Sequence, residues 1–280
     1  MNVFAPKEIA QNYIATGVAK AQLPISKMLV LGILAGIFIA MAGVGSLVAP
    51  ASIVQTNPSI ARLIGGSVFP GGLAMVLLAG SELFTGNNLL IIPVLQREIT
   101  LSKMLRNWLF VYIGNFAGAM LVAWLTAYGG TMSLFNNAVA ANAINTAYVK
   151  STMTFMDGIA RGILCNILVC AAVWMSFSAK DSGGKFLALF MPIMLFVLNA
   201  FEHSIANMYY GPVGLFAMRN PTYAAAAESA FGLNLSNLTW GNWLWYNLVA
   251  STIGNIIGGM VIIGISYWFI FLREPKKKKA

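Results

Sequence analysis

The single histidine of the chain, His203, directly follows Glu202 in the segment NAFEHSIANM, and strongly apolar sequence precedes it. An imidazole can donate or accept a hydrogen bond, and it titrates near pH 6.5 when unperturbed, so it could also exchange a proton here. In a soluble protein, a lone histidine on an apolar face is most often a packed core residue. Within a membrane span, an ionisable group is costly and usually marks a pathway for ions, protons or substrates.

Cys165 and Cys170 are the other side chains that could act as metal ligands or nucleophiles. They lie five residues apart in one predicted helix, which separates them by about 140° around its axis. They therefore cannot share a metal or form a disulfide with each other, and we interpret both as packing residues. One histidine and two such cysteines are too few for a haem site or a nucleophile–base pair. We expect no enzyme activity, no metal and no cofactor.

The elements that carry these residues are predicted to be transmembrane helices. The chain is 59% hydrophobic and 9% charged, against about 25% charged residues in a soluble domain. Two apolar regions, residues 63–96 and 186–218, are too long and too interrupted for one regular helix each. Four uncharged stretches approach or exceed the roughly 20 residues that span a bilayer: residues 28–49, 108–129, 162–179 and 243–272. We therefore predict six crossings of the membrane.

The positions of Lys and Arg predict the orientation, because cytoplasmic segments carry an excess of them. Basic residues concentrate in the N-terminal region, in residues 97–106 and 180–185, and at the C-terminal end. Both termini are therefore expected in the cytoplasm. Residues 1–27 are predicted to form a cytoplasmic amphipathic helix along the membrane interface, and residues 273–280 a basic tail facing lipid headgroups. The net charge of +9 follows from this topology and gives little reason to expect nucleic-acid binding.

Two short patterns occur once in each half of the chain. The third and sixth predicted spans contain GNFAGAM and GNIIGGM, and the second and fifth regions contain ELFTGN and EHSIAN. The halves, residues 28–129 and 156–272, are therefore predicted to be repeats of three spans each. Because three is an odd number, the second copy must be inserted upside down relative to the first.

The E-x-x-x-x-N segments are predicted to break the second and fifth helices, since Gly and Pro lie close to each. A break frees backbone N–H and C=O groups that lipid cannot satisfy. We expect Asn87 and Asn207 to cap the helices that restart after the breaks. We expect Glu82 and Glu202 to accept hydrogen bonds from freed N–H groups. A structural role is favoured for all four residues.

Asn115 and Asn255, in the repeated GN pairs, admit two interpretations. The glycines around them lie one turn apart and let helices approach closely. Each asparagine could then hydrogen-bond a neighbouring helix, or it could offer a donor to a pore. The sequence does not decide between the two.

The motifs GSELFTGN, RGILCNILVCAAVWM and FEHSIANM, together with the paired GN helices, resemble the formate/nitrite transporter family. The resemblance covers nearly the whole chain. It implies an all-α integral membrane protein with six transmembrane helices, an inverted 3+3 repeat and an aquaporin-like fold. It also implies a homopentamer with one pore in each subunit, in the cytoplasmic membrane of a prokaryote. Family substrates are small monovalent anions or their acids: formate, nitrite, hydrosulfide and sometimes acetate or lactate.

The resemblance also assigns residues to the pore. It implies that His203 is the central pore histidine, that Thr85 lies beside the pore on the first break, and that Asn166 joins them from the fourth span. Lys150 resembles a family lysine of the outer vestibule. The apolar constrictions are expected to comprise Leu83 and Phe84 on one side, and Leu73, Phe196 and Phe69 on the other.

Physical chemistry favours passage of a neutral species through such a pore. A bare anion crossing apolar constrictions loses its hydration with little return, whereas the neutral acid loses much less. We therefore expect Lys150 to attract the anion, a proton to be added near His203, and the neutral acid to pass. Whether the histidine or water supplies the proton is open from the sequence, as are the direction of flow and any gating by the N-terminal segment.

Formate is the favoured substrate, carried passively or with a proton, and nitrite or hydrosulfide is the alternative. An aquaporin-like channel for neutral solutes is a remote alternative, because two Asn-Pro motifs begin at Asn57 and Asn220. Both motifs fall in predicted outer loops, whereas a water channel needs them at the membrane midplane. Asn-Pro is also an ordinary way to start a helix, so we do not favour this alternative.

Overall fold

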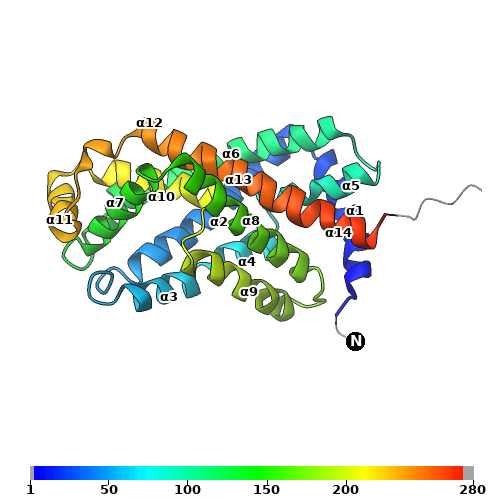
Figure 1. Cartoon of the computed structure of the whole chain (residues 1–280), viewed down its shortest axis with the longest axis horizontal. Helices are drawn as coiled ribbons and strands as arrows, with labels where there is room; N and C mark the ends of the chain where they lie inside the picture. Colours follow the sequence, from blue (N-terminus) through cyan, green and yellow to red (C-terminus); the bar gives the residue numbers. More distant parts are fainter. Residues whose placement is uncertain (1–2, 274–280) are drawn as a thin grey trace, which may run out of the picture.

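The computed structural model describes residues 3–273, and these form an all-helical molecule with one isolated β-bridge, between Val3 and Ala179. Figure 1 shows an elongated bundle with α1, α5 and α14 toward one end and α7 and α11 at the other. The α-helices are α1 (Pro6–Gln22), α2 (Ile25–Val48), α3 (Pro58–Val68), α4 (Pro70–Leu78), α5 (Ile91–Leu95), α6 (Leu101–Tyr128), α7 (Ala138–Ser151), α8 (Phe155–Ser176), α9 (Ser182–Leu198), α10 (Ser204–Ala217), α11 (Pro221–Phe231), α12 (Trp240–Asn242), α13 (Ala250–Ile256) and α14 (Ser266–Phe271). Short 3-10 turns are η1 (Gly86–Leu90), η2 (Thr131–Ser133) and η3 (Leu235–Asn237), and two π-helical stretches, η4 (Trp243–Val249) and η5 (Ile257–Ile265), join α12, α13 and α14.

Five helices in the described chain are long and apolar enough to cross a membrane: Ile25–Val48, Pro58–Leu78, Leu101–Tyr128, Phe155–Ser176 and Trp240–Phe271. The remaining predicted crossing is divided between α9, of 17 residues, and α10, of 14 residues. Six crossings are therefore present, and the fifth consists of two half-helices. The second is also interrupted, because α4 ends at Leu78 and helical structure resumes only at Gly86.

The two halves use the same close helix packing, which small residues permit. In the first half, a Cβ atom on Gly36 would overlap the backbone of Asn115, so α2 and α6 touch through their backbones. In the second half, a Cβ atom on Gly258 would overlap the backbone of Ile163, on α8. The half-helices α4, α9 and α10 pack against these two helix pairs.

Both Asn-Pro motifs begin helices, as the sequence predicts. The Asn57 side chain accepts a hydrogen bond from Ile60 N–H at the start of α3, and the Asn220 side chain accepts one from Thr222 N–H at the start of α11. Neither motif lies at a helix break, which removes the observation that favoured an aquaporin-like channel.

Candidate functional site

Asn115 and Asn255 hold the two breaks in the same way. Asn115 Nδ2 donates to Gly32 O at 2.8 Å and to Glu82 O at 2.9 Å, and its Oδ1 accepts from Phe84 N–H at 3.0 Å. Asn255 makes the equivalent three bonds, each of 2.8 Å, to Gly162 O, Glu202 O and Ser204 N–H. Both asparagines are fully buried. Each asparagine thereby satisfies a C=O and an N–H that the break sets free, and its third bond joins it to a carbonyl of the neighbouring helix, α2 or α8.

Asn87 and Asn207 do not cap the restarting helices, contrary to the expectation from sequence. The cap of α10 is His203, and η1 has no side-chain cap. Each asparagine instead donates to the glutamate five residues before it: Asn87 to Glu82 at 2.6 Å and Asn207 to Glu202 at 2.8 Å. Glu82 and Glu202 thus accept hydrogen bonds from side chains and not from the freed N–H groups, because Asn115 and Asn255 already hydrogen-bond the freed backbone groups.

A lysine completes each of these clusters with an ion pair. Lys150 Nζ lies 2.7 Å from Glu202 Oε2, and Lys20 Nζ lies 2.9 Å from Glu82 Oε1. Lys20 Nζ also donates to Asn87 Oδ1 at 3.0 Å. Both lysine side chains are mostly buried, with exposed fractions of 22% for Lys20 and 12% for Lys150. Lys150 is therefore a paired cation and not a free one.

Lys20 is the main residue of these clusters that the sequence does not single out, because its charge is explained by a cytoplasmic N-terminal segment. The α1 helix packs against the bundle and buries Ile9, Ala10, Tyr13, Gly17 and Ala21. A signal was available: Lys20 precedes Gly32 by twelve residues, and Lys150 precedes Gly162 by twelve. Helices α1 and α7 therefore occupy equivalent places in the two repeats.

His203 and Thr85 bring the two breaks together at the centre of the molecule. Thr85 Oγ1 lies 2.9 Å from His203 Nε2, and both side chains are buried. His203 Nδ1 accepts a hydrogen bond from Ala206 N–H at 3.0 Å, which caps α10. Because Nδ1 is an acceptor, the proton of the neutral ring belongs on Nε2, from which it is donated to Thr85.

The polar residues of this pair come from different positions in the repeat. Counting from the glutamate of each break, His203 corresponds to Leu83, and Thr85 corresponds to Ile205. The second break thus offers His203 and Ser204 where the first offers Leu83 and Phe84, and the first offers Thr85 where the second offers Ile205. His203 and Thr85 are consequently the side chains through which the two breaks hydrogen-bond each other.

Asn166 braces the first break from α8. Its Nδ2 lies within hydrogen-bonding distance of Thr85 O at 3.2 Å, Asn88 Oδ1 at 2.8 Å and Asn255 O at 2.7 Å. The Asn166 side chain is fully buried, and its Oδ1 has no partner among the described residues. The Asn166 amide therefore lies beside the Thr85 backbone and links the first break to α13, which carries Asn255.

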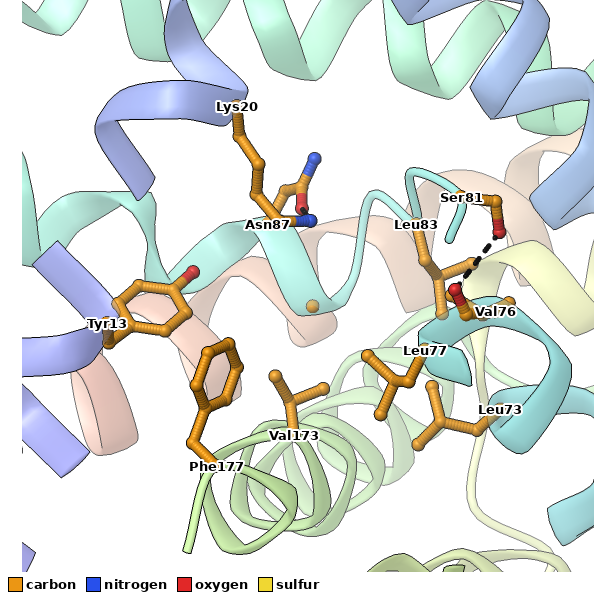
Figure 2. Close-up of a pocket in the computed structure, with 11 residues that line it drawn as sticks. Tyr13, Lys20, Leu73, Val76, Leu77, Ser81, Leu83, Asn87, Val173 and Phe177 are labelled. Carbon is orange, nitrogen blue, oxygen red and sulfur yellow. Dashed lines mark hydrogen bonds between the residues drawn. The ribbon is translucent and has the colours of Figure 1, made fainter. Parts of the chain in front are cut away.

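On the α1 side of the central pair lies a small pocket, which we call the inner pocket. Its lining residues are Tyr13, Lys20, Leu73, Val76, Leu77, Ser81, Leu83, Gly86, Asn87, Val173 and Phe177 (Figure 2). Leu73 therefore lies with Leu83, and not with Phe196 as expected from sequence. Phe84 is not part of this lining. It packs edge-on against Trp108 and Tyr112, with ring centroids 5.6 and 4.9 Å away.

On the other side of the pair, aromatic rings close around His203. The Phe196 ring stacks on the His203 ring with centroids 5.6 Å apart, and Phe69 meets Phe196 edge-on at 5.4 Å. Tyr210 was not anticipated from the sequence. Its ring stacks on Phe69 and lies 5.4 Å from Lys150 Nζ, and its hydroxyl hydrogen-bonds Ser46 Oγ. In the sequence, the one feature that could have indicated a place for Tyr210 in this site is its position three residues after Asn207.

Comparisons with known proteins agree with this architecture. Residues 7–269 match the sequence pattern of the family described as "Formate/nitrite transporter". This chain belongs to that family. It is 37% identical over 275 residues to the formate channel FocA of Escherichia coli K12, covering 98% of this chain and 96% of that one. It is also 36% identical over 276 residues to the uncharacterized transporter YrhG of Bacillus subtilis, covering 98% and 96%.

Solved structures of the formate/nitrite transporter family show the same fold. A chain titled "Pentameric formate channel with formate bound" superposes with a TM-score of 0.78 at 32% identity, covering 89% of this chain and 98% of that one. A second, titled "FNT family ion channel", gives a TM-score of 0.75 at 27% identity, covering 94% and 98%. The protein is therefore a multi-pass membrane protein with the architecture of this family.

Proposed function

We propose that this protein is a homopentameric channel that carries formate across the cytoplasmic membrane of a prokaryote, with both termini in the cytoplasm. Family membership supports the substrate class, and the FocA relative and the formate-bound structure favour formate. The observation that carries the proposal is the buried His203–Thr85 pair, a single polar site between apolar constrictions. Formate has three heavy atoms, so a site with one such pair could pass formate one molecule at a time.

The substrate crosses this centre as the neutral acid. Side chains such as Leu83 and Phe196 cannot replace the hydration of an anion, so the desolvation cost opposes passage of formate itself. The resting His203 ring is neutral, since its Nδ1 accepts from Ala206 N–H. A second proton on Nδ1 would oppose this N–H and remove the cap of α10. The proton therefore comes with the substrate from water, and His203 serves as the hydrogen-bond donor to Thr85.

Paired charges flank the centre on both sides. The field of Lys150 is offset by Glu202 at 2.7 Å, and the field of Lys20 by Glu82 at 2.9 Å. Lys150 therefore acts at short range, through its remaining N–H donors, more than as a long-range collector of anions. Its main effect is to compensate the buried Glu202 charge and so to hold the second break.

Uptake by liposomes that contain the purified protein tests the proposal. Isotope-labelled formate, nitrite and hydrosulfide are compared at several pH values, with protein-free liposomes as the control for passive leak. We expect formate to enter faster than the leak, and increasingly so as the pH falls. Formate uptake no faster than the leak, with nitrite or hydrosulfide passing, would assign a different substrate.

A further inference from the structure

The inner pocket contains a hydroxyl group for which the described residues provide no partner. Tyr13 is 1% exposed, and its Oη makes no hydrogen bond to any described residue. Figure 2 shows the Tyr13 hydroxyl on the edge of the ring that faces Asn87 and Lys20, across the pocket from Leu73. A buried donor that finds no acceptor costs about 1–3 kcal/mol. The pocket therefore favours an occupant that can accept a hydrogen bond.

The ring of Tyr13 is held in place by its neighbours. Its centroid lies 5.4 Å from that of Phe177, edge-on, and 6.3 Å from that of Trp174. Packing of this kind restricts rotation of the ring away from the pocket. Burial also raises the pKa of the Tyr13 hydroxyl well above its usual value, with smaller contributions from Cys170 and Glu82. The hydroxyl consequently remains a protonated donor throughout the physiological pH range.

A second donor faces the same space. The ammonium group of Lys20 carries three N–H donors, and the structure accounts for two acceptors, Glu82 Oε1 and Asn87 Oδ1. The pocket volume of about 40 Å³ is room for roughly three water-sized groups, at 10–15 Å³ each. A carboxylate on a single carbon has three heavy atoms, two of which are acceptors.

We propose that Tyr13 is a substrate-binding residue, whose hydroxyl binds the carboxylate of formate in the inner pocket before the substrate reaches Leu83. The ligand assignment rests on the proposed function. In the second repeat, the position equivalent to Tyr13, seven residues before Lys150, is Ala143, which carries no hydroxyl. The Tyr210 hydroxyl, on the other side of the central pair, is already bonded to Ser46.

One consequence is that α1 forms part of the substrate site. Tyr13 and Lys20 both belong to this helix, so formate in the inner pocket must stabilise the docked position of α1. By linkage, anything that displaces α1 must also weaken binding of formate there. The N-terminal helix and the substrate are thus coupled through the Tyr13 hydroxyl.

The test compares Tyr13→Phe with Tyr209→Phe, which removes the hydroxyl of an equally buried tyrosine outside the inner pocket. Concentration dependence of formate exchange is measured in liposomes between pH 5.5 and 8.5. For Tyr13→Phe we expect KM to rise roughly ten-fold at every pH, as for one lost hydrogen bond to a charged acceptor. Flux at saturating formate should stay within about two-fold, and Tyr209→Phe should leave KM unchanged.

An unchanged KM in Tyr13→Phe, with wild-type protein that conducts formate, would overturn the inference and leave the proposed function standing. Wild-type protein that conducts no formate would overturn both. If Tyr13→Phe does not assemble, hydrogen–deuterium exchange of the wild-type protein decides. Formate should then slow amide exchange in residues 6–22, and an absence of this protection would contradict the proposal.

Discussion

Thr85 Oγ1 and His203 Nε2 lie 2.9 Å apart, so a single hydrogen bond joins the breaks of two helices from opposite repeats. The other ring nitrogen is occupied by the cap of α10, at 3.0 Å from Ala206 N. A neutral imidazole with both nitrogens engaged has a fixed tautomer. His203 therefore holds Thr85 through its single Nε2–H donor, without carrying charge.

Two substitutions of His203 should distinguish its role as a hydrogen-bond donor from a role in taking up a proton. His203→Asn keeps a side chain that can both cap a helix and donate a hydrogen bond, but it cannot titrate. We expect fold, oligomer size and the pH profile of formate flux to be retained, with flux within about five-fold of wild type. His203→Leu, which copies the equivalent Leu83, should lower flux more than ten-fold because it removes the donor. A flattened pH profile in His203→Asn would show instead that the ring itself handles the proton.

The hydroxyl group of Thr85 should be required for full formate flux. Thr85→Val keeps the shape of the side chain but leaves the His203 Nε2–H without its acceptor, and an unsatisfied buried donor costs about 1–3 kcal/mol. We expect formate flux to fall about ten-fold while pentamer yield changes little. Thr126→Val is the matched control, since Thr126 is also buried and its hydroxyl donates to Val122 O in its own helix. Equal losses in both variants would indicate a packing defect and no special role for Thr85.

Lys150 should stabilise the protein by compensating Glu202. Removing one partner of a buried ion pair typically costs about 3–5 kcal/mol, because the other charge is left uncompensated. Lys150→Ala should therefore lower the melting temperature strongly, and adding Glu202→Gln should recover most of the loss. The KM for formate in the double variant should be close to wild type at both low and high salt. A salt-dependent rise in KM would show that Lys150 collects anions, as the family resemblance suggested.

Asn255 should be essential for forming the second break. Asn255→Leu leaves two buried backbone groups of the break, Glu202 O and Ser204 N–H, without this partner, at about 1–3 kcal/mol each, so we expect little folded pentamer in mild detergent. Asn142→Leu is the control, because this buried asparagine makes one hydrogen bond, to Leu47 O at 2.9 Å. It should assemble with a smaller loss of thermal stability. A stable Asn255→Leu pentamer would contradict the role assigned to Asn255.

The sequence predicts most of this architecture, because apolar length and repeated motifs depend on local composition. Such patterns predict the six crossings, the two breaks at Glu82 and Glu202, and the inverted repeat. It does not predict which groups satisfy a break. A capping role suits any asparagine near a helix start, but only the packing of α2 against α6 brings Asn115 within reach of the freed groups.

The residues around the pathway were harder to place for the same reason. Leu73 and Phe69 lie four residues apart, one turn of helix, yet Leu73 lines the inner pocket and Phe69 packs on Phe196. Which of them faces which side depends on the rotation of α4, which the sequence pattern leaves free. Lys20 was missed because its charge has an adequate explanation in topology, and only the twelve-residue spacing shared with Lys150 indicates otherwise.

The central claim is that formate crosses His203 as the neutral acid, and the charge that moves with it tests this most directly. Formate uptake into liposomes is followed together with internal pH and membrane potential, with protein-free liposomes as the control for diffusion of formic acid through lipid. We expect one proton to be taken up with each formate, no membrane potential to develop, and a potassium gradient imposed with valinomycin to have no effect. Formate uptake that generates a potential, or that follows the imposed one, would contradict it.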